Sequence, residues 1–179
     1  MKNLSIICIL ALVVSLMSGL AFAIEFKFDF YEGYTCLTHG DFEDPQEVTL
    51  GTGETVMVDI WLTGWDAVAR GNIAAVDYYF QYSPSLRVNS IVCNNLKPGG
   101  QFDESYQVSN TNEYANGVVE YGVGVPGPDV LLHTLELQAV GIGDDPIRAT
   151  LPPDGVVLNV DGDEFTDVTD GDGIIHSMA

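Results

Sequence analysis

Positive charge is scarce in this chain of 179 residues. Lysine and arginine together number 6, against 26 aspartates and glutamates, and the formal net charge is −20 at pH 7. Binding to nucleic acid or to an anionic membrane requires clustered Lys and Arg side chains, so the composition disfavours both partners. The acidic excess is typical of a soluble protein and favours the binding of cations.

Motifs of the common catalytic sites are also missing. The sequence contains no G-x-S-x-G, H-E-x-x-H or G-x-G-x-x-G pattern. The three histidines, His39, His133 and His176, stand apart without the spacing of metal ligands. We therefore expect a binding protein and not an enzyme.

The chain has one long hydrophobic run, which lies at its N-terminus. The run extends from Leu4 to Leu20 after the basic Lys2, and Ala21-Phe22-Ala23 follows as a small-x-small cleavage signal. This arrangement predicts a secretory signal peptide over residues 1–23, with a retained membrane anchor as the alternative. We expect a mature chain that begins at Ile24, carries no membrane segment and is secreted to the periplasm or the outside of the cell.

Cysteine is rare as well. Of the 3 cysteines, Cys8 lies within the predicted leader, which leaves Cys36 and Cys93. In an oxidising compartment these two can form a disulfide that closes a long loop. Two separate buried or reactive thiols agree equally well with the sequence.

Helical periodicity is almost absent, whereas short alternating segments recur between turn signals. The most regular is the central one, in which Val76, Tyr78 and Phe80 alternate with Asp77, Tyr79 and Gln81. A period of two predicts a strand with one buried face. The expected strands cover residues 24–30, 47–50, 54–64, 76–82, 86–93, 118–125, 130–140, 147–151 and 156–160, with weaker pairing at 102–109 and turn-forming residues at 110–117. The fold class is all-β.

The central strand runs into Tyr82-Ser83-Pro84-Ser85-Leu86-Arg87-Val88. This segment resembles the tyrosine, aspartate, proline, x, leucine, x, valine signature of cohesin domains. Ser83 stands where the family usually has aspartate, although serine can also form the side-chain-to-backbone bond that begins such a turn. With the order of the later strands, the resemblance covers about residues 50–176.

The resemblance implies a jelly-roll β-sandwich of about nine strands, a fold that cohesins share with certain cellulose-binding modules. We therefore expect three parts in the chain. These are the leader, residues 1–23, an N-terminal extension strand and loop, residues 24–46, and a cohesin-like β-sandwich domain, residues 47–179.

The alternation also predicts a binding face. If the even positions of the central strand face the core, Asp77, Tyr79 and Gln81 share its outer face. Asp59 and Trp61 then lie on the outer face of the strand at 54–64. Exposed aromatic side chains between polar groups suit a protein interface or the stacking of sugar rings. The alternative is that the N-terminal strand covers these faces with its own apolar side.

The resemblance implies docking of a dockerin-like or other surface protein, within polysaccharide-degrading or cell-surface assemblies. One alternative is a carbohydrate-binding module that stacks polysaccharide on Trp61, Trp65, Tyr78 and Tyr79. Another alternative is a structural, adhesin-like surface subunit.

Acidic residues gather near the C-terminus, at Asp161, Asp163, Asp167, Asp170 and Asp172. Calcium takes about six to eight oxygen ligands, and alternate carboxylates between glycines suit it. Asp170-x-Asp172-Gly173 matches the middle of an EF-hand-like loop, but the first ligand position of such a loop falls on Val168 and the last on Ala179. Calcium is therefore the candidate cofactor in a looser turn, and a solvated acidic turn is the alternative.

Overall fold

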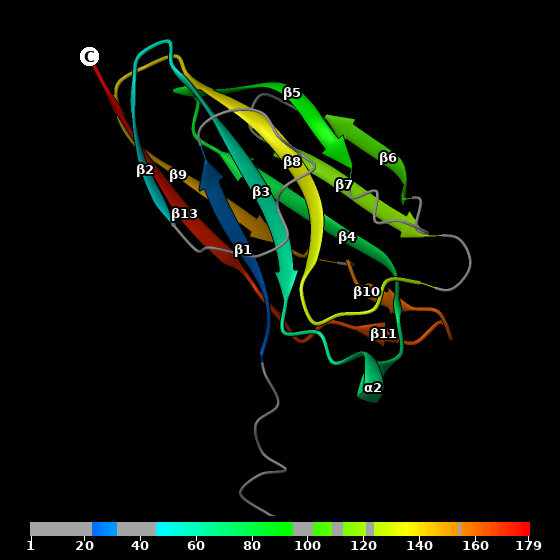
Figure 1. Ribbon diagram of the computed structural model, residues 1–179. Helices are drawn as coiled ribbons and strands as arrows, with labels where there is room; N and C mark the ends of the chain where they lie inside the picture. Colours follow the sequence, from blue (N-terminus) through cyan, green and yellow to red (C-terminus); the bar gives the residue numbers. More distant parts are fainter. Residues whose placement is uncertain (1–22, 32–45, 95–101, 109–112, 121–123, 154) are drawn as a thin grey trace, which may run out of the picture.

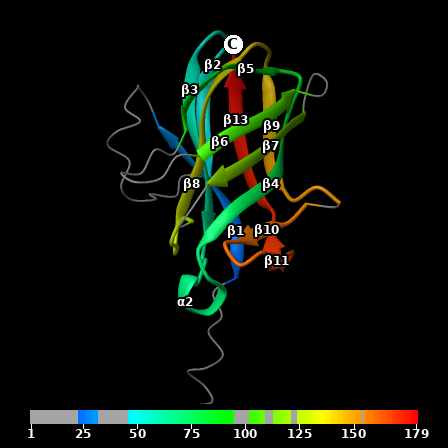
Figure 2. The same ribbon diagram turned by 90° about the vertical axis from the view of Figure 1, so that its right-hand side faces the viewer.

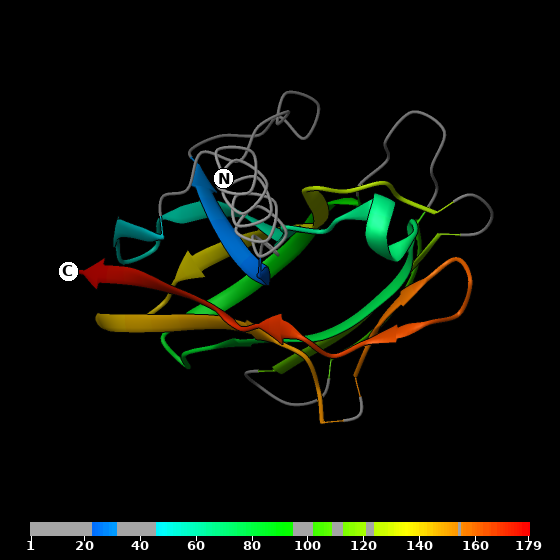
Figure 3. The ribbon, with the colours of Figure 1, turned by 90° about the horizontal axis from the view of Figure 1, so that it is seen from below.

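The computed structural model describes residues 23–31, 46–94, 102–108, 113–120, 124–153 and 155–179. Their strands form two sheets that lie over one another as two layers (Figures 1 and 3). This arrangement confirms the predicted all-β sandwich. Residues 1–22 of the predicted leader lie outside the described ranges, and within these ranges no helix has the length and apolar character needed to cross a membrane.

The first sheet has the strand order β12-β1-β3-β8-β5. In this order the strands are Val168–Thr169, Ile24–Tyr31, Thr55–Thr63, Val130–Ala139 and Leu86–Asn94. β1 pairs antiparallel with β3 along its length, from Glu25 opposite Thr63 to Tyr31 opposite Met57. The strand that we assigned to an N-terminal extension is thus a full member of the sheet.

The second sheet has the strand order β11-β10-β4-β9-β13-β2, and β7 joins it by pairing with both β4 and β6. These strands are Glu164–Phe165, Val157–Asn159, Ile73–Tyr82, Gly143–Thr150, Gly171–Met178 and Glu47–Gly51, with β7 at Glu113–Glu120 and β6 at Phe102–Val108. The turn predicted over residues 110–117 is wrong for 113–117, because these residues pair in register with β4.

Aromatic side chains from both sheets meet in the core. Phe26 lies 5.5 Å from Tyr78 and Phe28 lies 6.0 Å from Phe80, measured between ring centroids. All four are at most 2% exposed, and burial of such a side chain contributes about 1.5–3 kcal/mol. The hydroxyl of Tyr78 lies 2.5 Å from Nδ1 of the buried His133, so this histidine is a structural residue of the core.

The last strand, β13, did not appear among the expected strands. Its buried positions are Gly171, Gly173, Ile175 and Ser177, and three of these four side chains are small. A Cβ at Gly171 would lie 2.4 Å from the carbonyl oxygen of Phe26, which shows that β13 packs directly against β1. Glycine is required by this close approach and not by a turn. The chain is extended from Gly171 to Met178, so Asp170 and Asp172 do not lie in the EF-hand loop that the mismatches at Val168 and Ala179 already argued against.

Candidate functional site: the exposed face of the second sheet

β4 has one buried and one accessible side. Val76, Tyr78 and Phe80 are each 1% exposed, whereas Asp77 is exposed and Tyr79 and Gln81 are half-buried. This alternation follows from the strand geometry, which sends successive side chains to opposite faces. Asp77, Tyr79 and Gln81 therefore lie together on the outer side of the second sheet.

Two neighbouring strands widen this surface. On one side, Thr150 and Arg148 of β9 lie opposite Tyr79 and Gln81 of β4. On the other side, β7 runs antiparallel to β4 and separates it from β6 (Figure 2). We call Asp77, Tyr79, Gln81, Arg148 and Thr150 the exposed sheet face. It combines one aromatic ring with a carboxylate, an amide, a guanidinium and a hydroxyl group.

Asp77 is electrostatically distinct within this face. Burial by neighbouring atoms raises the pKa of its carboxyl group above the ordinary value, because desolvation disfavours the charged form. A partner that offers a cation or a hydrogen-bond donor to Asp77 would offset this desolvation. Such a group would therefore bind Asp77 more strongly than it would bind a fully hydrated carboxylate.

Arg148 is already engaged in ion pairs on the same sheet. One of its terminal nitrogens lies 2.6 Å from Asp170, and its Nε lies 3.4 Å from Asp172. Asp170 directly precedes β13 and Asp172 lies within it, opposite Arg148 of β9. The pairs hold the guanidinium at the border of the exposed sheet face.

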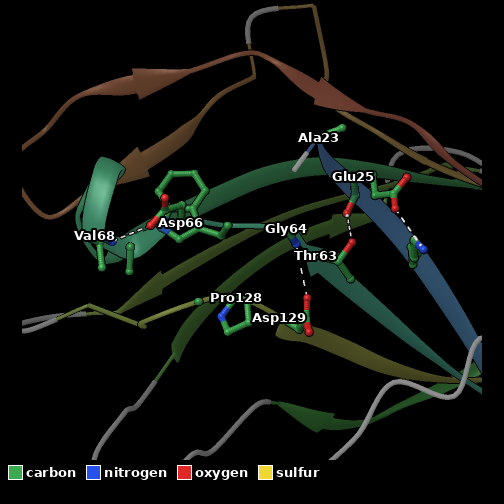
Figure 4. Close-up of a pocket in the computed structure, with 12 residues that line it drawn as sticks. Ala23, Glu25, Thr63, Gly64, Asp66, Val68, Pro128 and Asp129 are labelled. Atoms are coloured by element: carbon green, nitrogen blue, oxygen red, sulfur yellow. Dashed lines mark hydrogen bonds and ion pairs between the residues drawn. The ribbon is translucent and has the colours of Figure 1, made fainter. Parts of the chain in front are cut away.

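A pocket lies at the end of the sandwich where β3 leads into α2, which spans Ala67–Arg70 (Figure 4). Its walls come from the start of β1, the end of β3, and the loop before β8. Glu25, Lys27, Asp66 and Asp129 supply its charged groups. Its volume is about 810 Å³.

The five C-terminal acids do not converge. Asp167 forms two hydrogen bonds with Arg70, of 2.8 and 2.7 Å, and Asp170 and Asp172 pair with Arg148. Asp163 accepts a hydrogen bond from the side chain of Asn159, and the backbone of Asp161 donates to that side chain. In the described part of the chain no three acidic, histidine or cysteine side chains come together to hold a metal ion. Calcium binding stays a prediction.

Comparisons with known proteins bear on the fold. No protein-family model and no curated protein matches the chain. Among solved structures, the sixth cohesin of scaffoldin B from Acetivibrio cellulolyticus, in complex with a dockerin, has 14% identity and a TM-score of 0.58, over 87% of this chain and 99% of that one. A non-cellulosomal cohesin from Archaeoglobus fulgidus has 16% identity and a TM-score of 0.55, over 73% and 86%. A cohesin module of a Clostridium perfringens family 33 glycoside hydrolase has 15% and 0.56, over 75% and 93%.

This chain has the cohesin fold. The likeness confirms the fold that the resemblance of the Tyr82–Val88 segment to cohesins implies.

The departure of Ser83 from the cohesin signature has a structural counterpart. Asp145 of β9 is 1% exposed, and its carboxylate accepts hydrogen bonds from Ser85 and, at 2.7 Å, from Ser177. The hydroxyl groups of Ser83 and Ser85 lie 2.9 Å apart. Burial raises the pKa of Asp145, but hydrogen bonds from Ser85, Ser83 and Ser177 outweigh it and leave the pKa below its ordinary value. The side chain of Ser83 itself accepts a hydrogen bond from the backbone N–H of Ser85 at 3.4 Å, which is the side-chain-to-backbone bond expected of serine in this turn.

Two residues predicted for the binding face are buried in this cohesin fold. Asp59 is 0% and Trp61 is 4% exposed, and Asp59 accepts a hydrogen bond from Thr134. The prediction that they are accessible is wrong, because β3 is a central strand with both of its faces buried. β1 does not cover β3 as the alternative supposed, since it pairs with β3 edge to edge and directs Phe28 into the core.

Sequence reasoning missed Arg148 and Thr150, which β9 brings beside Tyr79 and Gln81. Their signal was present in the alternation with Ile147 and Ala149, but pairing of β9 with β4 is a long-range property. The predicted disulfide lies outside the description, because Cys36 is not among the described residues and the side chain of Cys93 is not described.

Proposed function

We propose that the chain is a secreted, non-catalytic docking module that binds a dockerin-like protein through the exposed sheet face, within a polysaccharide-degrading or cell-surface assembly. The observation that carries the proposal is the composition of this face, where a single half-buried aromatic, Tyr79, lies among polar side chains. Several cohesins with the same fold were solved in complexes with dockerins, which supports a partner of this kind.

The chemistry of the face suits a folded protein partner. Extended strands present their outer side chains at regular spacing, so Asp77, Gln81 and Thr150 can form several directional hydrogen bonds with one partner element. Tyr79 can serve as the anchor, since tyrosines in partly buried positions dominate the binding energy of many interfaces. Polar groups around it set the orientation of the partner.

Carbohydrate stacking receives less support from the structure. A platform for sugar rings needs exposed aromatic faces, but Trp61, Trp65 and Tyr78 are 4%, 1% and 1% exposed. Trp65 also donates its ring N–H to the carbonyl of Gly71 at 2.8 Å. Of the four aromatics proposed for stacking, Tyr79 alone retains an accessible surface.

The test is calorimetric titration of the protein with dockerin modules encoded in the same genome. We expect one of them to bind, and Tyr79→Ala to weaken it by at least about 30-fold, the effect of a hot-spot residue of about 2 kcal/mol. Asn89→Ala, an exposed polar residue of β5 in the other sheet, is the matched control and should bind normally.

The proposal is overturned if no dockerin binds, or if Tyr79→Ala and Asn89→Ala bind equally well. Sedimentation of the protein with insoluble cellulose, xylan and chitin tests the carbohydrate alternative in parallel. Retention on a polysaccharide, together with no measurable binding of dockerins, would favour that alternative.

A further inference from the structure

β2 is weakly anchored in the second sheet. It stands at an edge of this sheet, and among the described strands β13 alone pairs with it (Figure 1). Leu50 is the one buried residue of β2, and Val48 is half-buried. A strand with so few apolar contacts opens locally at a lower free energy than the strands of the core.

One histidine links β2 to the two strands beside it. His176 of β13 lies on the outer side of the sheet, between the buried Ile175 and Ser177. Its Nδ1 lies 2.7 Å from Oδ1 of Asp144, which is on β9. Its Nε2 lies 3.8 Å from Oε2 of Glu47, the first residue of β2. The two ring nitrogens therefore face acids on two different strands.

The protonation state of His176 decides how many of these acids the ring can serve. A neutral imidazole carries a single N–H donor, so it can donate to Asp144 or to Glu47 but not to both. An imidazolium ring donates from both nitrogens and adds a positive charge between the two carboxylates. The full link across β9, β13 and β2 thus requires the proton.

We propose that His176 is a proton-dependent clamp, which fastens β2 to the second sheet while its ring is protonated and loosens β2 when its ring is neutral. β9 stays in place in both states, because it also pairs with β4. When β2 opens, the edge of β13 is uncovered, and this edge is a row of backbone donors and acceptors that another strand can pair with. The inference is independent of the docking function.

The charged groups around the ring agree with this role. Toward the start of β13, the next charged side chains on the same face are Asp172 and Arg148, which lie 3.4 Å apart. The positive charge of Arg148 is therefore offset by an acid. Beyond the end of β2, Glu54 accepts a hydrogen bond from the backbone N–H of Gly51. Asp144 and Glu47 are thus the groups that act on His176 directly.

The direction of the pH dependence follows from these contacts. The hydrogen bond to Asp144, together with the negative charges of Asp144 and Glu47, raises the pKa of His176 above its ordinary value of about 6.5. The contribution of the clamp is fully present below that ordinary value and is lost as pH rises through the folded-state pKa. Because the side chain of His176 is 37% exposed, solvent screens the pairs and the effect is confined to β2.

NMR titration of the His176 ring in the protein tests the contacts. We expect a pKa above about 6.5, a return toward that value in Asp144→Asn, and a smaller decrease in Glu47→Gln. Asp172→Asn is the matched control, since it removes the same charge from the same face outside contact with the ring. A pKa at or below about 6.5, or equal shifts in Asp144→Asn and Asp172→Asn, overturns the inference.

Hydrogen exchange tests the consequence for β2. At about pH 5.5 the amides of β2 should be about two- to fivefold better protected in the wild-type protein than in His176→Gln, after correction for intrinsic exchange rates. At about pH 9, where the ring is neutral, the two proteins should be equal. Unchanged protection of β3 shows that the variant is folded. Equal protection of β2 at both pH values, or a difference that does not depend on pH, also overturns the inference.

Discussion

At the scale of single residues, Asp145 shows how a buried carboxylate secures the turn between β4 and β5. Its oxygens accept hydrogen bonds from Ser85, which follows Pro84, and from Ser177 of β13. Three segments distant in sequence thus meet at one side chain. Because its hydrogen bonds favour the ionised form, Asp145 makes the stability of this corner dependent on pH.

We expect Asp145→Asn to lower the free energy of unfolding at pH 7 by about 1–3 kcal/mol, because hydrogen bonds to a charged acceptor are replaced by weaker ones. The pKa of Asp145 is depressed in the folded state, so its contribution is present above the ordinary value of about 3.9 and is lost as pH falls through the folded-state pKa. Urea unfolding at pH 7 and at pH 3 measures the difference.

The matched control is Asp144→Asn, since the side chain of Asp144 is 81% exposed and contacts the surface residue His176. It should change the stability at pH 7 much less than Asp145→Asn does. An Asp145→Asn effect that grows toward pH 3 would contradict the assigned role.

A second prediction concerns moving the carboxylate of this cluster from residue 145 to residue 83. Ser83→Asp alone should destabilise the protein, because a second carboxylate is placed near that of Asp145. In combination with Asp145→Ser the same substitution should be less harmful, since one carboxylate is restored to the serine cluster. A double-mutant cycle from denaturant unfolding should give a coupling energy of at least about 0.5 kcal/mol. If the effects of the two substitutions are additive, a carboxylate at residue 83 does not replace that of Asp145.

At the scale of elements, the lower end of the sandwich in Figure 1 is closed by α2 and the segment of β10 to β12. Arg70, the last residue of α2, pairs with Asp167 through two hydrogen bonds. Its guanidinium carbon also lies 5.0 Å from the ring centroid of Phe165 and 5.7 Å from that of Trp65. One side chain therefore connects a short helix, an aromatic pair and the loop between β11 and β12.

We expect Arg70→Ala to lower the free energy of unfolding by about 1–2 kcal/mol, because it removes both the cation–π contacts and the ion pair. Asp167→Asn should cost less, since this carboxylate is 61% exposed and solvent screens the pair. Hydrogen exchange should show faster exchange in β11 and β12 for Arg70→Ala. Arg87→Ala, an exposed arginine of β5, is the control, and an equal effect of both substitutions would argue against the closing role of Arg70.

At the scale of the whole molecule, the negative charge of −20 is distributed over an extended sandwich and is only partly balanced by arginines. Arg70 and Arg148 pair with three of the five acids that we predicted to bind calcium. A calcium ion at Asp170 and Asp172 must compete with Arg148. We therefore expect calcium to bind weakly and to displace Arg148 only in part from these two carboxylates.

We expect calcium to raise the melting temperature of residues 24–179. At ten times the dissociation constant the stabilisation is about 1.4 kcal/mol, which corresponds to a rise of about 3–6 °C for a chain of this size. Asp170→Ala and Asp172→Ala should abolish the rise, whereas Arg148→Ala should enlarge it by freeing the carboxylates. Sodium chloride at equal ionic strength is the control, and an equal rise with sodium would exclude a specific calcium site.

The fold was largely predictable because alternation is a local property. Strand β4 and the turn at Pro84 follow from the order of a few neighbouring residues. β13 escaped prediction since its glycines carry no hydrophobic signal, and their small size matters only where β1 approaches within contact distance. The turn assigned to residues 113–117 failed because polar residues with low strand propensity are held in a strand by β4 and β6.

The chain's own pattern of residues was sufficient to establish the all-β class, the outward direction of Asp77, Tyr79 and Gln81, and the resemblance to cohesins. It was not sufficient to show that Asp59 and Trp61 are buried, because periodicity separates two faces of a strand without revealing whether the outer face is covered. Arg148 joined Tyr79 and Gln81 at one surface, and Asp145 reached Ser85, only through long-range strand pairing. Such contacts depend on which strands become neighbours, a choice made by the packing of the whole core and not by any local segment.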